Sequence, residues 1–249
     1  MIAVMTVLWV VQCRTRNAGW VDVGWAAGLA AAATFYANWF DGDPTRRALM
    51  GFLGTLWGAR LALHLARRVA AEPEDGRYRR MREYWAGTAD RNFLWFFLAQ
   101  ALLVALFSLP FLVCARADTA LAPGWQVAAI VVWLTAVGGE SIADWQLARF
   151  RANPANRGRT CRQGLWRTSR HPNYFFEWLH WWSYVLLAIG APGAWLTLLG
   201  PVLMFAFLYR VTGIPYTEQQ ALASRGDDYR DYQRTTSAFF PWFPKGDAK

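Results

Sequence analysis

The sequence has few charged residues, few cysteines and none of the common soluble-enzyme motifs. Asp, Glu, Lys and Arg make up 17% of its 249 residues, whereas a soluble globular protein has about 25%. The three cysteines, Cys13, Cys114 and Cys161, are scattered and form no CxxC pair, which argues against a disulfide framework or a zinc site. GxGxxG, P-loop, HExxH and GxSxG motifs are missing. A soluble enzyme is therefore an unfavourable interpretation.

Apolar and aromatic residues are abundant instead, at 55% and 16% of the chain, with 16 tryptophans. They form long blocks separated by short arginine-rich stretches. Since a membrane-spanning helix needs about 20 mostly apolar residues, we predict an all-α, polytopic integral membrane protein with one seven-helix domain over residues 1–249. The predicted spans are Met1–Gln12, Trp20–Phe40, Ala48–Ala66, Asn92–Cys114, Trp125–Leu147, Tyr174–Gly190 and Ala194–Tyr209.

The basic residues predict the orientation of these spans. Four segments, 13–19, 67–91, 148–173 and 210–249, hold 22 of the 26 Lys and Arg residues, and the alternate segments hold three. Because cytoplasmic loops are enriched in Lys and Arg, we expect the N-terminus outside and the C-terminus in the cytoplasm, with a bacterial inner membrane as the location. This orientation accounts for most of the net charge of +9, so no nucleic-acid partner is predicted. The aromatic C-terminal tail is expected to lie at the membrane interface.

Ionisable residues inside apolar spans are costly and mark candidate functional positions. Asp22 lies two residues into the second span, where it is either functional or a hydrated aspartate near a helix end. Arg60 and His64 are four residues apart in the third span and share a helical face. They are either functional or a polar clamp to another helix.

A second polar stripe occurs in the fifth span. Glu140 and Asp144 are four residues apart, and Arg151 lies seven residues further on the same face if the helix continues. The two acids are able to bind hydroxyl groups of a ligand, or to pair structurally with arginines.

The densest group of polar residues is the run 164–177. His171-Pro172 predicts a helix start, because proline in the first turn needs no amide partner. Asn173 and Glu177 then lie one turn apart on that helix. A helix N-terminus beside several arginines attracts anions, and an amide with a carboxylate recognises an amide or a ribose. The run therefore predicts a site for a phosphate-bearing cofactor, with a capped helix and basic flanks as the alternative. No metal site is predicted.

Taken together, these residues resemble a known family. The run 164–177, read with Glu140, Asp144 and Arg151 before it and the DDYRDY segment at 227–232 after it, is similar to the membrane steroid 5-alpha-reductases, and most of all to their bacterial, DUF1295-like branch. The VDVGW (21–25), EDGRY (74–78) and FFPWFP (239–244) stretches also fit that branch. RHPNY (170–174) alone is less specific, since isoprenylcysteine and phospholipid methyltransferases carry similar strings.

The resemblance implies an NADPH-dependent reduction of a carbon–carbon double bond conjugated to a ketone. The lipophilic substrate would be a 3-oxo-4-ene steroid or a related isoprenoid, reached from the surrounding membrane lipids. Family cofactor contacts fall on Arg77, Asp144, Arg151, Asn173, Glu177 and Tyr229, and Arg170, Tyr174, Arg210 and Tyr232 are neighbours by position. The cytoplasmic loops at about 67–91, 148–173 and 210–249 would carry these contacts.

The family also uses a carboxylate near the second span and a tyrosine on the next helix to hold the substrate ketone. Asp22 matches the carboxylate, but the tyrosine has no clear match, because residues 60–64 read RLALH. His64 is the expected substitute, and Glu140 stands where the family has asparagine. A hydrogen-bond donor in a dry cavity would stabilise the negative charge that develops on the ketone oxygen. The alternatives are an S-adenosylmethionine-dependent membrane methyltransferase and a non-enzymatic seven-span binding protein.

Overall fold

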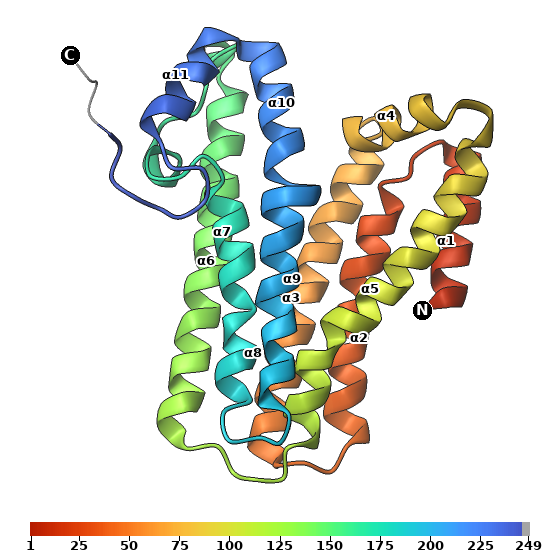
Figure 1. Ribbon diagram of the computed structural model, residues 1–249, viewed down its shortest axis with the longest axis vertical. Coiled ribbons are helices and arrows are strands. Elements are labelled where there is room, and N and C mark those ends of the chain that lie inside the picture. Colours follow the sequence, from red (N-terminus) through yellow and green to blue (C-terminus); the bar gives the residue numbers. More distant parts are fainter. Residues whose placement is uncertain (246–249) are drawn as a thin grey trace. The chain divides into compact units, whose positions relative to one another are not determined.

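The computed structural model describes residues 1–245, and all regular elements within that range are helices (Figure 1). This confirms the predicted all-α class. The chain divides into two compact units, which are described separately below. Unit 1 comprises Met1–Gln126 and Leu187–Leu199, and unit 2 comprises Val127–Leu186 and the segment that begins at Gly200.

In unit 1 the helices α1, α2, α3 and α5 lie side by side, and the short helix α4 runs across one end of them (Figure 1). Its elements are α1 (Ile2–Thr15), α2 (Trp20–Trp39), α3 (Pro44–Ala71), α4 (Gly76–Trp85), η1 (Ala86–Thr88), α5 (Ala89–Arg116) and η4 (Ala194–Leu198). The helices α2 and α3 pack closely because small residues face each other. A Cβ atom added to Gly51 would lie 2.5 Å from Cβ of Ala37, and one added to Gly54 would lie 2.8 Å from Cβ of Ala33. Such contacts favour close approach of helices in membranes.

Arg46, near the start of α3, is 1% exposed. Its backbone N–H is bound by the capping carboxylate of Asp43 at 2.8 Å. Its guanidinium donates to the carbonyl oxygens of Leu187 at 2.6 Å and of Thr119 at 2.9 Å, and makes a longer contact with Ile189. A buried charge needs such partners, so this arginine joins three chain segments of unit 1.

Unit 2 is built from shorter helices with several interruptions. Its elements are most of α6 (Pro123–Ala152), η2 (Pro154–Asn156), η3 (Gly164–Arg167), α7 (Pro172–His180), α8 (Trp182–Leu187), α9 (Leu199–Ala206), the π-helical turn η5 (Phe207–Val211), α10 (Ile214–Arg225) and α11 (Asp227–Thr235). The helix start predicted at Pro172 is confirmed. The segment predicted as one helix, 174–190, is divided into α7 and α8 at Trp181.

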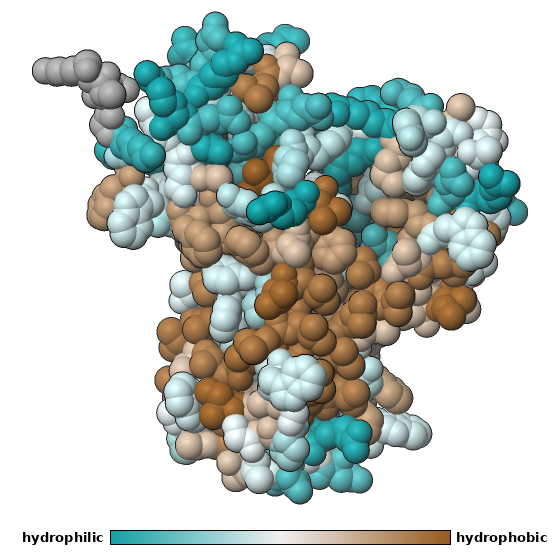
Figure 2. Space-filling model, in the orientation of Figure 1, coloured by the Kyte–Doolittle hydropathy of each residue, from teal (hydrophilic) through white to brown (hydrophobic). Residues whose placement is uncertain are grey.

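The chain is a membrane protein by the length and composition of its helices. Four helical segments within the described residues are long and apolar enough to cross a membrane: Pro44–Ala71, Gly76–Arg116, Pro123–Ala152 and Ala194–Arg225. The apolar α1 is shorter. Large hydrophobic side chains such as Phe52, Trp95 and Val131 are exposed on these helices. Figure 2 shows apolar residues along the long helices and hydrophilic residues over α4 in unit 1 and over α11 in unit 2. The exposed apolar side chains are suited to contact membrane lipids.

Candidate functional site

Asp22 lies in the first turn of α2, and its carboxylate meets two side chains from the start of α4. The phenol of Tyr78 donates a hydrogen bond to Oδ1 of Asp22 at 2.7 Å. The guanidinium Nη2 of Arg77 donates to Oδ2 at 3.3 Å. Asp22 and Arg77 are each about 30% exposed at their side chains, and Tyr78 is buried. The structure thus places a carboxylate, a phenol and a guanidinium together at the end of α2.

Asp75 fixes the position of Arg77. It caps α4 by accepting from the backbone N–H of Arg77 at 2.9 Å. It also accepts from Nε of Arg77 at 3.2 Å and from Nη2 of Arg68 at 2.6 Å. Burial alone would raise the pKa of Asp75, but the charge and hydrogen bonds of Arg77, with help from Arg68, outweigh burial and hold this pKa below its ordinary value. Asp75 therefore stays ionised and holds Arg77 beside Asp22.

His64 has a different environment from the one predicted. It lies on α3 with an exposed side chain. Within residues 1–245, no hydrogen bond or ion pair joins it to Asp22. The hydrogen-bonded neighbour of Asp22 is Tyr78, which the sequence reasoning did not select. The available signal was the EDGRY stretch, in which Tyr78 directly follows the predicted Arg77.

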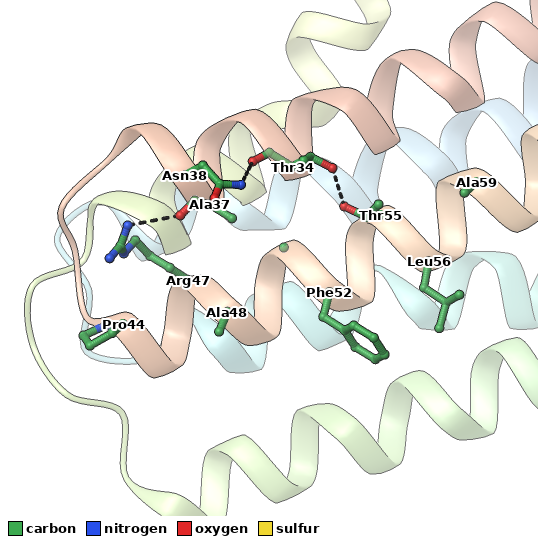
Figure 3. Close-up of a pocket in the computed structure, with 11 residues that line it drawn as sticks. Thr34, Ala37, Asn38, Pro44, Arg47, Ala48, Phe52, Thr55, Leu56 and Ala59 are labelled. Carbon is green, nitrogen blue, oxygen red and sulfur yellow. Dashed lines mark hydrogen bonds between the residues drawn. The ribbon is translucent and has the colours of Figure 1, made fainter.

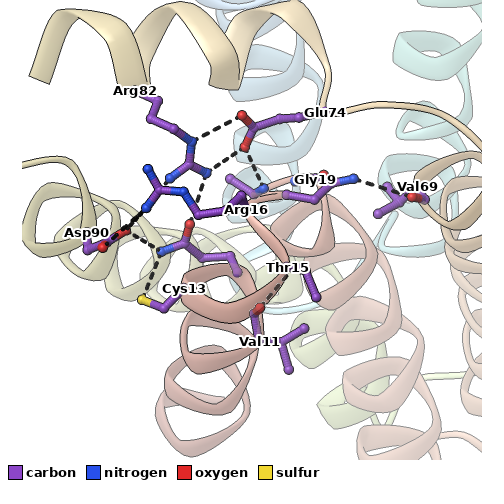
Figure 4. Close-up of polar contacts among 12 residues, drawn as sticks. Val11, Cys13, Thr15, Arg16, Gly19, Val69, Glu74, Arg82 and Asp90 are labelled. Atoms are coloured by element: carbon purple, nitrogen blue, oxygen red, sulfur yellow. Dashed lines mark hydrogen bonds and ion pairs between the residues drawn. The ribbon is translucent and has the colours of Figure 1, made fainter. Parts of the chain in front are cut away.

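A second polar network attaches α4 to the helices around it (Figure 4). Glu74 accepts from Nη2 of Arg82 at 2.7 Å and from the backbone N–H of Ala18 at 2.8 Å. Arg82 also donates to Oε1 of Gln12 at 3.1 Å and lies 3.7 Å from Asp90. Arg82 and Glu74 are 13% and 11% exposed at their side chains. These contacts hold the helix that carries Arg77 and Tyr78 in place.

In unit 2, the predicted polar stripe of α6 meets the predicted helix start at α7. Nδ2 of Asn173 donates to Oδ1 of Asp144 at 3.1 Å. Its Oδ1 accepts from the backbone N–H of Tyr174 at 3.0 Å, which fixes the orientation of the amide. Glu177, one turn later, is 9% exposed, and its Oε1 lies 3.8 Å from Nδ1 of His180. Glu140 is also buried. Asp144, Asn173 and Glu177 are thus partly or largely buried polar groups on two adjoining helices.

A tighter cluster surrounds Glu218 of α10, which the sequence reasoning did not single out. Its Oε1 accepts from Nε of Arg170 at 2.6 Å and lies 3.2 Å from Nε2 of His171. The phenol of Tyr229 donates to the same oxygen at 3.3 Å, and Gln233 donates to Oε2 at 2.7 Å. Four side chains from two chain segments therefore share one carboxylate, which a third segment carries. Glu218 lies 47 residues from His171 in the sequence, and none of the motifs selected from the sequence includes it.

The predicted residues around this cluster are largely engaged with the chain itself. Arg170 also donates to the backbone carbonyls of Gln233 at 2.9 Å and Thr236 at 2.6 Å. The phenol of Tyr232 donates to the carbonyls of Trp166 and Ser169. Burial raises the pKa of the Tyr229 and Tyr232 phenols, so both stay protonated donors at neutral pH.

His171 and Tyr174 stack with their rings 5.3 Å apart and nearly parallel. Burial lowers the pKa of His171, and this outweighs its hydrogen bond to Glu218, which acts in the opposite direction. The phenol of Tyr174 lies 3.2 Å from the hydroxyl of Thr217. Arg210, in the π-helical turn, is exposed. At neutral pH, His171 is therefore an uncharged member of the cluster.

Two cavities lie within single units. In unit 1, a groove of about 690 Å³ runs between α2 and α3 (Figure 3) and contains none of the predicted site residues. Arg47, at one end of it, donates to the carbonyl oxygens of Ala37 and Gly42, so it caps α2. In unit 2, a pocket of about 440 Å³ at the C-terminal end of α6 is lined in part by the predicted Arg151. The described residues contain no group of three or more His, Cys, Asp and Glu suited to hold a metal ion.

Comparison with known proteins gives a family. The family model described as "Protein of unknown function (DUF1295)" matches residues 8–236. The chain is also 29% identical over 269 positions to "Uncharacterized protein C594.04c" of Schizosaccharomyces pombe (strain 972 / ATCC 24843). That alignment covers 94% of this chain and 76% of the relative. No solved structure matches the chain at a significant level.

Proposed function

The chain belongs to the DUF1295 family, and from that premise we propose that it is an NADPH-dependent reductase of an enone in a lipophilic substrate. A 3-oxo-4-ene steroid or a related isoprenoid lipid is the substrate class. The proposal joins the resemblance to steroid 5-alpha-reductases, carried by residues 164–177 and 227–232, with the side-chain geometry at Asp22. The family model is described as one of unknown function, so the proposed activity rests on the resemblance and on the residues around Asp22 and Asn173.

The observation that carries the proposal is the hydrogen bond between Tyr78 and Asp22 at 2.7 Å. The resemblance implies a carboxylate and a tyrosine that together hold a ketone, and the sequence offered no clear tyrosine. Tyr78 supplies it from α4, and in the proposal it takes the role first given to His64. Arg77 donates to the other carboxylate oxygen and helps to orient Asp22.

The chemistry follows from these positions. When bound, NADPH supplies the hydride that adds to the β-carbon of the enone. In the structure the single proton of the Tyr78 phenol is donated to Asp22. When the ketone binds, this proton turns to the ketone oxygen, where negative charge develops as the new carbon–hydrogen bond forms. Asp22 orients this phenol, and a proton from water completes the α-carbon. The balance is enone, NADPH and one proton giving the saturated ketone and NADP⁺. A preoriented donor of this kind contributes about 10²–10³ in rate.

The residues of unit 2 fit a dinucleotide by their chemistry. Asn173 and Asp144 form a fixed amide–carboxylate pair, which suits a nicotinamide carboxamide or a ribose hydroxyl. Glu177 adds a buried carboxylate one turn away. Arg151, in the pocket at the end of α6, supplies a cation for a phosphate. We assign cofactor binding to these four residues first, with Tyr229 beside them.

We also propose that the protein crosses the membrane seven times. In this topology α1, α2 and the α7–α8 pair join the four longer segments, the N-terminus is outside and the C-terminus is cytoplasmic. The supporting observation is the distribution of Lys and Arg, with 22 of 26 in the four predicted cytoplasmic segments. A bacterial inner membrane is the proposed location.

Steroid turnover tests the proposed catalytic residues, and NADPH binding separately tests the proposed cofactor-binding residues. Purified protein should consume NADPH in the presence of a 3-oxo-4-ene steroid. Tyr78→Phe and Asp22→Asn should lower this turnover by about 100-fold with NADPH affinity unchanged, whereas His64→Gln should retain it. Asn173→Ala and Glu177→Ala should instead abolish NADPH binding.

Thermal unfolding of the same purified protein distinguishes the reductase hypothesis from the methyltransferase hypothesis. NADPH, and not S-adenosylmethionine, should protect it against thermal unfolding. Protection by S-adenosylmethionine alone would refute the reductase, and full activity of Tyr78→Phe would remove this residue from the site. A thermal unfolding curve like that of the wild type checks that each variant is folded.

A further inference from the structure

The groove between α2 and α3 of unit 1 is polar at one end and mostly apolar along its length (Figure 3). Arg47 and Asn38 lie at the end where the loop joins the two helices, and Phe52, Leu56 and Ala59 line the α3 side beyond it. No acidic residue lines the groove. Its volume of about 690 Å³ falls within the range of about 300–1,000 Å³ that is typical of small-molecule sites.

The polar groups along the groove are bonded within the chain. The hydroxyl oxygens of Thr34 and Thr55 lie 2.7 Å apart, and the Thr34 hydroxyl donates to the carbonyl oxygen of Ala30 at 3.0 Å. Nδ2 of Asn38 donates to the carbonyl oxygen of Thr34 at 2.7 Å. Burial of a polar group costs free energy only when its hydrogen bonds are lost. An apolar chain can therefore lie against these residues without leaving their hydroxyl groups unpaired.

Arg47 is a fixed cation at the polar end of the groove. Its Nε donates to the carbonyl oxygen of Gly42 at 2.9 Å, and its Nη1 donates to those of Ala37, at 3.1 Å, and Phe40. A guanidinium has five N–H donors, and the two on Nη2 make no hydrogen bond with residues 1–245. No carboxylate in that range lies within 4 Å of this guanidinium. Two charged donors are therefore available to a ligand.

The groove is as long as one leaflet of a membrane. From Arg47 to Ala59 the helix α3 rises about 18 Å, and half of the hydrocarbon core of a bilayer is about 15 Å thick. Arg47 lies near the start of the membrane-spanning segment Pro44–Ala71, at the level of the lipid headgroups. Phe52 and Leu56 are 65% and 45% exposed, so the apolar part of the groove is open to lipid.

We propose that this groove binds one phospholipid from the leaflet on the side of the α2–α3 loop. Nη2 of Arg47 donates to the phosphate, because guanidinium donors match phosphate oxygens in pairs. One acyl chain lies along Phe52, Leu56 and Ala59. In the topology proposed above this is the outer leaflet. The bound lipid joins α2 to α3 and stabilises the folded protein. This site is independent of the proposed reductase activity.

Two other coverings of the groove explain less of its structure. General contact with membrane lipids needs only exposed apolar side chains, and it requires neither a fixed cation nor unused donors. A second copy of the chain, related by a two-fold axis, would place the same surface on both sides of the contact. Arg47 would then face a lining that contains no acidic residue. A phospholipid supplies both the anion and the apolar chain.

The main test fills the groove and leaves the contacts of Arg47 intact. Ala48→Phe/Ala59→Phe adds two rings to exposed lining positions, and Ala99→Phe/Ala105→Phe adds them to exposed positions of α5 outside the groove. Thermal unfolding of delipidated protein in detergent is followed against added dioleoylphosphatidylglycerol or dioleoylglycerol, at one salt concentration. The wild type and the α5 variant should bind the phospholipid at least 10-fold more tightly than the diacylglycerol. The groove variant should bind it about 10-fold more weakly than the wild type does.

A second pair of variants tests recognition of the phosphate. Arg47→Gln should weaken binding of phosphatidylglycerol about 10-fold and leave binding of the diacylglycerol unchanged. Arg116→Gln is the control, because Arg116 is exposed at the same end of unit 1, lies over the ring of Phe40 and does not line the groove. Since Arg47 also caps α2, unfolding without lipid checks that the variant is folded. If it is not, the two phenylalanine variants decide.

The outcomes separate the three coverings of the groove. Weaker binding of phosphatidylglycerol in the groove variant, with the α5 variant like the wild type, supports the site. Equal binding by these two variants overturns the proposal, as does a wild type that binds the diacylglycerol as tightly as the phospholipid. Light scattering in detergent tests the second copy of the chain. A dimer that the groove variant abolishes would show that another copy fills the groove, and would also overturn the proposal.

Discussion

Two sets of arginines in this protein carry the same kind of charge and meet different surroundings. The paired set consists of Arg68, Arg77 and Arg82 in unit 1 and Arg170 in unit 2, each bound to at least one carboxylate. The open set consists of the four arginines that line the pocket at the end of α6, namely Arg151, Arg157, Arg159 and Arg225. The paired set attaches helices to their neighbours, whereas the open set lines a pocket and has no carboxylate within 4 Å among residues 1–245.

The physical basis of the contrast is the partner that each guanidinium meets. Removal of one member of a largely buried ion pair leaves an uncompensated charge and costs about 3–5 kcal/mol. Removal of an exposed arginine without a partner leaves nothing uncompensated. Substitutions in the two sets should therefore separate stability from binding.

The largest effect is expected for Glu218→Ala. This change removes the acceptor shared by Arg170, His171, Tyr229 and Gln233 and leaves Arg170, 11% exposed at its side chain, without its carboxylate. We expect a loss of about 3–5 kcal/mol in the free energy of unfolding, measured by denaturant titration in detergent. Arg230→Gln, which breaks the exposed pair with Asp227, is the control and should cost about 0.5 kcal/mol or less. Equal losses would show that burial does not distinguish the pairs.

Arg82→Gln should have the next largest effect. It removes the charged hydrogen bonds to Glu74 and the bond to Gln12, and each bond to a charged group contributes about 1.5–3 kcal/mol. We expect the melting temperature to fall and α4 to become accessible to protease, because Glu74 and Arg82 tie α4 to α1. Unchanged proteolysis would mean that α4 is held by its apolar contacts.

Acidification should destabilise the cluster at Glu218. Since burial lowers the pKa of His171 in the folded protein, the unfolded chain takes up this proton first as the pH falls below about 6.5. The free energy of unfolding should fall from that pH downward, until the lower pKa of the folded state is passed. Titrations at pH 7.5 and 5.5 measure this loss, and it should be smaller in His171→Gln. An equal loss in that variant would assign the pH dependence to other groups.

The smallest effect on stability is expected for Arg157→Gln/Arg159→Gln. Both side chains are exposed and without acidic partners among the described residues, so we expect a change within about 0.5 kcal/mol. The same denaturant titration measures it. A loss as large as that of Arg82→Gln would place these arginines in the paired set and remove the distinction.

Much of the fold follows from the sequence, because apolar runs and prolines mark helices directly. Pro172 begins α7 as predicted, and α2 ends one residue before its predicted limit. Tyr78, the residue that α4 contributes beside Asp22, was harder to predict. Half of the residues of α4 are charged, so no apolar periodicity marks this helix. Its position depends in part on Glu74 and Arg82, which bond to Ala18 and Gln12, 56 and 70 residues away in the sequence.

The residues of the candidate site were predictable where local motifs mark them. Asn173 and Asp144 were both selected, from separate motifs, and the structure brings them together. Tyr78 and Glu218 were missed because neither forms a helical repeat with its partners. Tyr78 lies 56 residues from Asp22 and Glu218 lies 47 from His171, and a single sequence carries no signal for such pairings.

The buried Arg46 has a consequence for the order in which the chain is assembled. Two of its carbonyl acceptors, at Leu187 and Ile189, are synthesised some 140 residues after it, when the residues from 127 to 186 have already been added to the chain. The two sequence segments of unit 1 are therefore synthesised at different times, with a segment of unit 2 between them. Its first 126 residues emerge with a guanidinium that cannot complete its hydrogen bonds, and the unit closes only when a later segment returns to it. Unit 1, although it is the first to be started, therefore cannot be completed before residues 127–186 of unit 2 have been synthesised.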